Sequence, residues 1–147
     1  MNVTLREITM ENFIECIQLR VGDAQKNYVA SNMFSLAEAK ADKVSNPFAI
    51  YADEQLVGFI MYHFNVEEKR GYVSRLMVDA RFQGKGYGRV AMSEVVDRLK
   101  RVPGIRDIQT SFHPENRVAD ALYASLGFAR TGEVVDGEVV VRISLGK

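Results

Sequence analysis

Hydrophobic residues recur along the chain with two different spacings. A period of two is typical of β-strands, and a period between three and four is typical of amphipathic helices. The strand-like stretches are residues 3–8, 48–52, 56–64, 72–78 and 105–112, with two more in the tail from 130 to 145. The helical stretches are residues 10–21, a segment around 35–39, residues 88–102 and residues 116–126. This order predicts an α/β fold with a mixed sheet of about seven strands and flanking helices.

Capping and turn residues mark several boundaries of these elements. Thr9 has the chemistry of a helix N-cap, and Ser35-Leu36-Ala37-Glu38 has the spacing of a capping box. Pro103-Gly104 ends the long helix, and Asp136-Gly137 is a strong hairpin signal in the tail. Since no stretch reads as a linker or an internal repeat, we expect one domain over residues 1–147.

The composition excludes several functional classes. Lysine plus arginine and aspartate plus glutamate number 19 each, so no basic excess points to nucleic acid. A single cysteine, Cys16, excludes an intrachain disulfide and suits the reducing cytoplasm, and we expect it to be a small buried hydrophobe. The apolar runs are too short for a membrane span, and the N-terminus lacks the pattern of a signal peptide. We therefore expect a cytoplasmic protein without nucleic-acid or membrane partners.

A glycine-rich loop between a central strand and an amphipathic helix is the most informative segment. It consists of Gln83, Gly84, Lys85, Gly86, Tyr87, Gly88 and Arg89. Glycines allow a sharp turn and close approach to a ligand, while the N–H groups at the start of a helix bind anions such as a pyrophosphate. Arg89 replaces the third glycine of a dinucleotide-binding loop, and no Walker spacing is present. Taken alone, the segment could equally be a tight turn with solvated basic residues.

A second group of residues lies about thirty positions further along the chain. Asn116, Ala119 and Tyr123 are spaced to share one face of the last helix, while Val118, Leu122 and Leu126 form an adjacent face that can pack on the sheet. Singly, Asn116 reads as a helix cap and Tyr123 as a core aromatic. Their combination with the glycine loop favours a ligand site.

The two segments together resemble the GNAT superfamily of acetyltransferases. Gln83-x-x-Gly86-x-Gly88 after Leu76-Met77-Val78 is similar to its acetyl-CoA signature, and the block from Asn116 to Gly127-Phe128 is similar to its second motif. The resemblance implies a GNAT fold with a mostly antiparallel sheet, in which the fourth and fifth strands splay apart. It also implies acetyl-CoA as cosubstrate, without a metal.

The resemblance further implies roles for individual residues. The amides of residues 83–89 would hold the pyrophosphate, the backbone of Leu76, Met77 and Val78 would pair with the pantetheine arm, and Asn116 would hydrogen-bond that arm. Tyr123 would lie beside the sulfur and act as general acid, since a phenol of pKa about 10 is protonated at neutral pH.

The general base is not identified by the sequence. The family often places a carboxylate on the fourth strand, but here Ser74 and Arg75 occupy its middle and no acid lies within residues 72–78. Glu67, Glu68 and Asp79 flank the strand, and loss of the proton to bulk water is an equal alternative.

Three functions remain open at this point. Residues 25–32 and 35–39 resemble those of bacterial spermine and spermidine N-acetyltransferases, which suggests a polyamine acceptor held by Glu11, Glu15 and Asp23. Those acids could instead form a solvated helix face. The second function is acetylation of another amine, such as an aminoglycoside or a protein N-terminus. The third is a non-catalytic acyl-CoA-binding module, against which Tyr123 argues. The expected partners are thus a small-molecule amine and, as an open possibility, a second copy in a homodimer.

Overall fold

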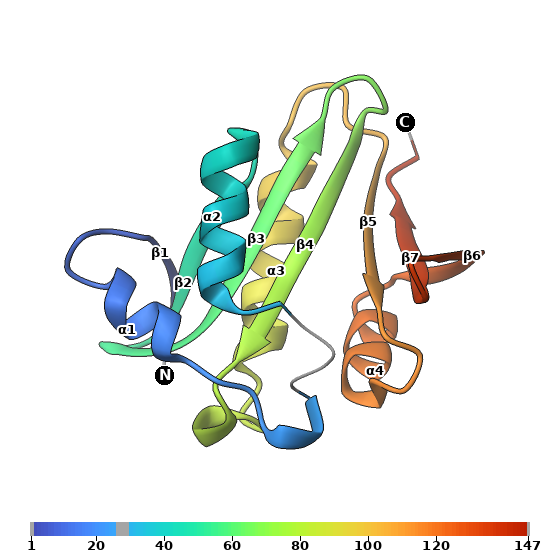
Figure 1. The fold of residues 1–147 in the computed structure, drawn as a ribbon. Coiled ribbons are helices and arrows are strands. Elements are labelled where there is room, and N and C mark those ends of the chain that lie inside the picture. Colours follow the sequence, from blue (N-terminus) through green and yellow to red (C-terminus); the bar gives the residue numbers. More distant parts are fainter. Residues whose placement is uncertain (1, 26–29, 147) are drawn as a thin grey trace.

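A seven-stranded mixed sheet in the order β1-β2-β3-β4-β5-β7-β6 runs through the computed structural model, which describes residues 2–25 and 30–146 (Figure 1). Each neighbouring pair of strands is antiparallel except β4 and β5, which are parallel. The strands are β1 Val3–Glu7, β2 Asn46–Ala52, β3 Gln55–Asn65, β4 Arg70–Val78, β5 Asp107–Phe112, β6 Ala129–Val135 and β7 Glu138–Ser144. The predicted fold class is confirmed.

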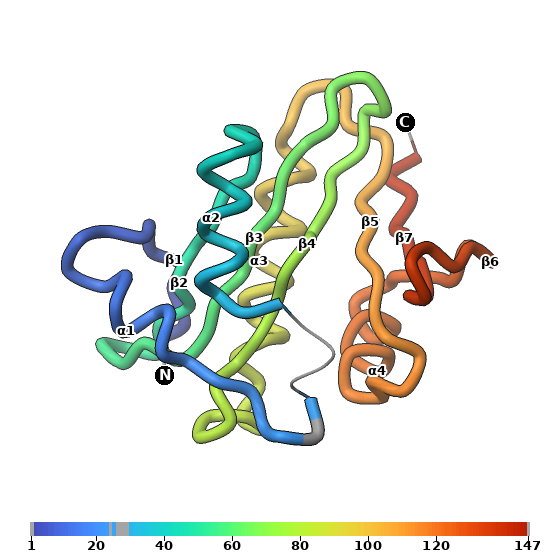
Figure 2. Tube along the Cα trace, viewed as in Figure 1, coloured from blue at the N-terminus to red at the C-terminus, as the bar shows by residue number. Residues whose placement is uncertain are grey.

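Helices cover both faces of this sheet. They are α1 Phe13–Gln18, α2 Asn32–Asp42, α3 Tyr87–Lys100 and α4 Arg117–Ser125, with short 3-10 turns η1 Asp23–Gln25 and η2 Ala80–Phe82. The traces of α2 and α3 pass on opposite sides of β3 and β4 (Figure 2). One apolar core joins the sheet to α3 and α4, and a second joins it to α1 and α2. Cys16 lies fully buried in the second core, as expected.

The first helix is shorter than the predicted 10–21. Residues 10–12 form turns, and Leu19 is already extended, with φ −62° and ψ 142°. The cause is tertiary, because the Arg20 N–H donates to Asp79 Oδ2 and the Arg20 carbonyl accepts from the Ala80 N–H. Backbone pairing with the loop after β4 therefore ends α1 early. Ile14, expected on the buried stripe, is 50% exposed.

The start of α2 also differs from the capping-box prediction. Ser31 is the N-cap, and its side chain accepts from the Phe34 N–H. Ser35 lies one turn inside the helix, where its hydroxyl donates to the Ser31 carbonyl. The expected apolar face of α4 is incomplete as well, since Val118 is 69% exposed.

The only parallel strand pair among the described residues is also the shortest pairing. β4 and β5 pair only from Arg70–Asp107 to Tyr72–Gln109, after which the two strands diverge (Figure 1). The closed end carries an ion pair of 2.7 Å between Arg70 Nε and Asp107 Oδ1. At the point of divergence, Thr110 Oγ1 donates to the Val73 carbonyl at 2.8 Å. The remainder of β4 is therefore open on its β5 side.

The opposite side of β4 packs tightly against β3 at Gly58. A Cβ atom built there would lie 2.4 Å from the Met77 carbonyl oxygen, which is backbone and cannot rotate away. We expect Gly58→Ala to lower the free energy of unfolding by about 1–3 kcal/mol, the usual cost of overpacking. Urea denaturation measures this change. Gly22→Ala is the matched control, because nothing lies within 4 Å of its Cβ position. Equal stabilities for the two variants would contradict the packing described here.

Candidate active site

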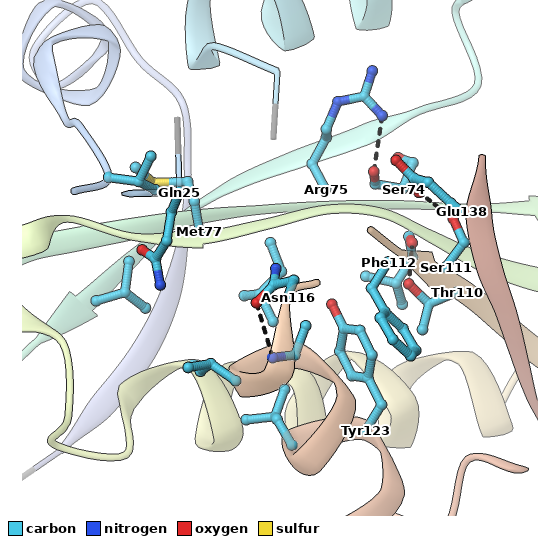
Figure 3. Close-up of a pocket in the computed structure, with 18 of the residues that line it drawn as sticks. Gln25, Ser74, Arg75, Met77, Thr110, Ser111, Phe112, Asn116, Tyr123 and Glu138 are labelled. Atoms are coloured by element: carbon cyan, nitrogen blue, oxygen red, sulfur yellow. Dashed lines mark hydrogen bonds between the residues drawn. The ribbon is translucent and has the colours of Figure 1, made fainter. Parts of the chain in front are cut away.

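A cavity of about 800 Å³ opens where β4 and β5 diverge (Figure 3). Its walls come from both faces of the sheet: α3 and α4 contribute on one side, and the connection between α1 and α2 on the other. The cavity is therefore lined from both faces of the sheet. The predicted site residues that line it are Leu76, Met77, Val78, Gln83, Gly84, Gly86, Tyr87, Gly88, Arg89, Asn116 and Tyr123.

The open edge of β4 presents backbone groups to this cavity. The Asp79 N–H donates to the Val57 carbonyl, and these two residues stand directly opposite each other in the antiparallel register. Hydrogen-bonded and non-bonded pairs alternate in such a ladder, so Met77 turns its backbone groups toward β3. The backbone N–H and C=O groups of Leu76 and Val78 then point toward the gap between β4 and β5. An extended chain entering the gap meets a strand edge ready for pairing.

The glycine loop forms the start of α3. Gly86 is the N-cap residue with φ 85°, and the Val90 N–H donates to its carbonyl, which begins the helical ladder. The amides of Gly88 and Arg89 thus lie in the first turn, where N–H groups find no partner within the helix. Gly84, with φ 79°, has no atom within 4 Å of its Cβ position. This arrangement is a cradle for an anion.

Polar side chains of the loop divide between the cavity and solvent. Gln83 Nε2 donates to the Val78 carbonyl at 2.9 Å, so it marks the end of the open β4 edge. Arg89 lines the cavity and donates to the Ser125 hydroxyl on α4. Lys85 is exposed and is not among the lining residues, so its predicted role in cofactor binding stays a prediction.

Asn116 serves as a helix cap and also lines the cavity. Its Oδ1 accepts from the Ala119 N–H at 3.2 Å, which fixes the side chain at the start of α4 (Figure 3). This bond leaves the amide nitrogen to donate into the cavity. Asn116 can therefore cap α4 and donate a hydrogen bond to a ligand at the same time.

Tyr123 reaches the cavity from α4 and is 6% exposed. Its ring packs between Phe112 and Phe128, with centroids 6.1 and 5.7 Å away. Burial raises the pKa of its hydroxyl to about 12; a hydrogen bond with Thr110 lowers the pKa, and the charge of Glu138 raises it. The hydroxyl is therefore fully protonated at neutral pH.

The three acids predicted to hold the acceptor lie away from the cavity lining. Glu11 precedes α1, so it does not share a helical face with Glu15, and both are exposed. Asp23 is exposed on η1. Lys26 to Val29 of the polar segment lie outside the described residues, while Gln25 and Ala30 line the cavity. Acceptor binding by the three acids stays a prediction.

Several lining residues escaped the sequence analysis. Arg75 donates to Glu38 on α2 at 3.1 Å, and His63 stacks on Tyr72 with ring centroids 5.0 Å apart. Burial lowers the pKa of His63. Glu138, at the start of β7, also lines the cavity. These lining residues are scattered over β3, β4 and β7, so no local motif could have grouped them.

The shape and chemistry of this site suit coenzyme A. The cradle at α3 offers backbone donors, which a pyrophosphate requires, and the open edge of β4 offers donors and acceptors for an amide-containing arm. Among the described residues, no group of three or more His, Cys, Asp or Glu side chains is placed to hold a metal ion.

Comparison with known proteins identifies the family. The model of the acetyltransferase (GNAT) family matches residues 4–128. The chain belongs to this family. Spermine/spermidine N(1)-acetyltransferase from Bacillus subtilis strain 168 is 29% identical over 148 residues, which span 96% of this chain and 97% of that protein. This GNAT protein is therefore an acetyl-CoA-dependent N-acetyltransferase.

Solved structures share the same fold. PaiA N-acetyltransferase from Thermoplasma acidophilum, in complex with coenzyme A, has a TM-score of 0.75 at 16% identity, covering 98% of this chain and 99% of that one. Spermidine N-acetyltransferase from Vibrio cholerae, in complex with CoA and spermine, has a TM-score of 0.75 at 19% identity, covering 97% and 94%. Within residues 2–25 and 30–146, no helix of this GNAT protein is long and apolar enough to cross a membrane.

Gly88 offers a clean test of the anion cradle. Its φ is not positive, and an added Cβ would make only ordinary contact, 3.5 Å from Val78 Cγ2. We expect Gly88→Ala to leave the melting temperature unchanged or raised, because alanine is the better helix former by about 1 kcal/mol. The new methyl group should nevertheless weaken coenzyme A binding by obstructing approach to the loop. Isothermal titration with coenzyme A measures the effect. Unchanged affinity would mean that the loop is a turn without a role in binding coenzyme A.

Proposed function

We propose that this GNAT protein acetylates a polyamine such as spermidine or spermine, with Tyr123 as the proton donor to the departing sulfur. The observation that carries the proposal is the coincidence of three features in one cavity: the open β4 edge, the α3 anion cradle and the Tyr123 hydroxyl. An amine acceptor is supported by the Bacillus subtilis relative, whose name gives spermine and spermidine as its substrates.

Acetyl-CoA supplies an activated acetyl thioester when bound. Leu76 and Val78 would hold its arm through their backbone groups, and the amides at the start of α3 would hold its pyrophosphate. Asn116 would donate from its amide nitrogen. A backbone N–H on the open β4 edge would also stabilise negative charge that develops on the carbonyl oxygen. Together these groups would hold the thioester in the gap between β4 and β5.

Tyr123 would act at the sulfur. With a pKa of about 12, its hydroxyl is a weak acid, while an ordinary thiol has a pKa of about 8.5. Proton transfer from this hydroxyl to a departing thiolate would therefore be uphill at its resting pKa, and the hydroxyl would first act as a hydrogen-bond donor. Its proton would move only as positive charge builds up nearby.

The charge of the cavity bears on the choice of acceptor. Arg75 would repel a polyamine, but its ion pair with Glu38 offsets that charge. Arg89 lies at the cradle, where positive charge suits a pyrophosphate. The carboxylates among the lining residues are Asp136 and Glu138. The part of the cavity lined by Asp136 and Glu138 would thus favour a cation, whether a polyamine or another amine.

Replacing Tyr123 with phenylalanine tests its role. The ring and its packing remain, so we expect a change in stability of about 1 kcal/mol or less from the lost hydrogen bond. The turnover number should fall by about 10²- to 10⁴-fold, the usual contribution of a proton donor. Steady-state release of free thiol measures turnover. Tyr51→Phe is the matched control, since its hydroxyl accepts from Asn12 Nδ2 in the interior, outside the cavity. A normal turnover number for Tyr123→Phe, with chemistry rate-limiting, would make Tyr123 a structural aromatic.

An amine panel tests the acceptor class. We expect spermidine to exceed butylamine in kcat/KM by about 10- to 100-fold, because a second ammonium adds a charge-assisted contact. The preference should shrink at higher salt, since the Debye length is about 10 Å at 0.1 M. Glu11→Gln and Glu15→Gln should narrow the gap between the two amines. Equal kcat/KM for spermidine and butylamine, insensitive to salt, would contradict the polyamine assignment. If no amine led to thiol release, acetyl transfer itself would be refuted.

A further inference from the structure

One carboxylate faces the cavity from the side opposite Tyr123. Along β7, Val139, Val141 and Ile143 belong to the core shared with α3 and α4. Side chains alternate along a strand, so Glu138 and Arg142 point to the other face of the sheet. On that face Arg142 is hydrogen-bonded to Gln109, and Glu138 is hydrogen-bonded to Ser111. Gln109 and Ser111 are the two neighbours of Thr110 on β5.

Glu138 is held in a fixed position. The Ser111 hydroxyl donates to Glu138 Oε1 at 2.7 Å (Figure 3). The side chain is half-buried and lines the cavity. Asp136, the other lining carboxylate, is exposed at the tip of the β6–β7 hairpin. Of the two, only Glu138 combines burial with an anchoring hydrogen bond.

Tyr123 and Glu138 approach the gap from opposite sides. Thr110 and Phe112 point toward α4, where they meet the Tyr123 hydroxyl and ring, while Ser111 between them points toward Glu138. The two acidic groups are close enough for the Glu138 charge to act on the tyrosine hydroxyl. A thioester in the gap would therefore have Tyr123 on one side and a carboxylate on the other.

We propose that Glu138 receives the reacting nitrogen of the acceptor amine, across the β4–β5 gap from Tyr123, with Ser111 as its positioning residue. This inference rests on the proposed acetyl transfer. Other charged lining groups suit the role less well, because Arg75 and Arg89 are cations held by Glu38 and Ser125. His63 is the one imidazole in the described lining, and it is stacked on Tyr72 over β3 and β4.

Two protons leave the acceptor nitrogen during the reaction. The ammonium loses one proton to solvent, and the free amine forms the C–N bond to the thioester carbonyl carbon. The nitrogen then carries positive charge, which the carboxylate of Glu138 stabilises before accepting the second proton. As the C–S bond breaks, the sulfur takes the Tyr123 proton, and Glu138 returns its proton to Tyr123 through water. The products are one amide, one free thiol and one proton released to solvent.

This arrangement couples the two ends of the reaction. Burial is the main cause that holds the proton on Tyr123, and while the cavity holds no cation the negative charge of Glu138 adds to this effect. Positive charge on the attacking nitrogen cancels that field, so the tyrosine becomes a stronger acid as the sulfur begins to leave. Proton donation is thereby timed to follow attack.

Glu138→Gln tests the proposal, because glutamine keeps the size and can still accept from Ser111. Kinetics with acetyl-CoA should show kcat/KM reduced by about 10- to 100-fold for spermidine and butylamine alike, since both present a reacting nitrogen. Coenzyme A affinity and the melting temperature should match the wild type. Ser111→Ala should give a smaller loss, and it supplies the same test if Glu138→Gln fails to fold.

Glu133→Gln is the matched control, since this β6 carboxylate is exposed, pairs with Arg142 and is not a lining residue. Unchanged kcat/KM in Glu138→Gln would overturn the proposal. A loss confined to spermidine would also overturn it, because Glu138 would then hold a distal ammonium. Wild-type protein that releases no thiol with any amine would instead refute the proposed function, and the inference would fall with it.

Discussion

The parting of β4 from β5 is the constraint on which the rest of the site depends. Two contacts fix where it begins, the Arg70–Asp107 ion pair at the closed end and the bond from Thr110 to the Val73 carbonyl at the point of divergence. Beyond them, β4 keeps one edge paired with β3 and leaves the other open. In a continuous sheet, the backbone N–H and C=O groups of Leu76 and Val78 would pair with β5, and no cavity would remain.

An opening through the sheet makes both faces available to one reaction. The α3 and α4 face supplies the anion cradle, Asn116 and Tyr123, whereas the opposite face supplies Glu138. Under the proposed function, cofactor and acceptor would meet there in a ternary complex, without a covalent enzyme intermediate. Cys16 takes no part in such chemistry, because it is fully buried and burial raises the pKa of its thiol to about 12.

Local pattern predicts much of the fold, although the capping box at Ser35 lies one turn inside α2. Strand and helix order, the Asn116 cap and the α3 loop all follow from periodicity, capping chemistry and glycine spacing. The end of α1 could not be predicted, because Arg20 is drawn into pairing with Asp79 and Ala80, which lie sixty residues away in the chain. Glu138 escaped for the same reason: its partner Ser111 is 27 positions distant, and neither belongs to a motif. The cytoplasmic location, the absence of nucleic-acid and membrane partners, and the homodimer remain predictions.

Residue-resolved amide hydrogen exchange can test whether the open edge of β4 binds the acyl-CoA arm. Leu76 turns its N–H toward the gap, while Met77 turns its own toward Phe59 on β3, so neighbouring residues provide signal and internal control. With saturating acetyl-CoA, we expect slowed exchange at Leu76 and in the first turn of α3, with Met77 little changed. Exchange at Leu76 that is equally fast with and without acetyl-CoA would contradict it.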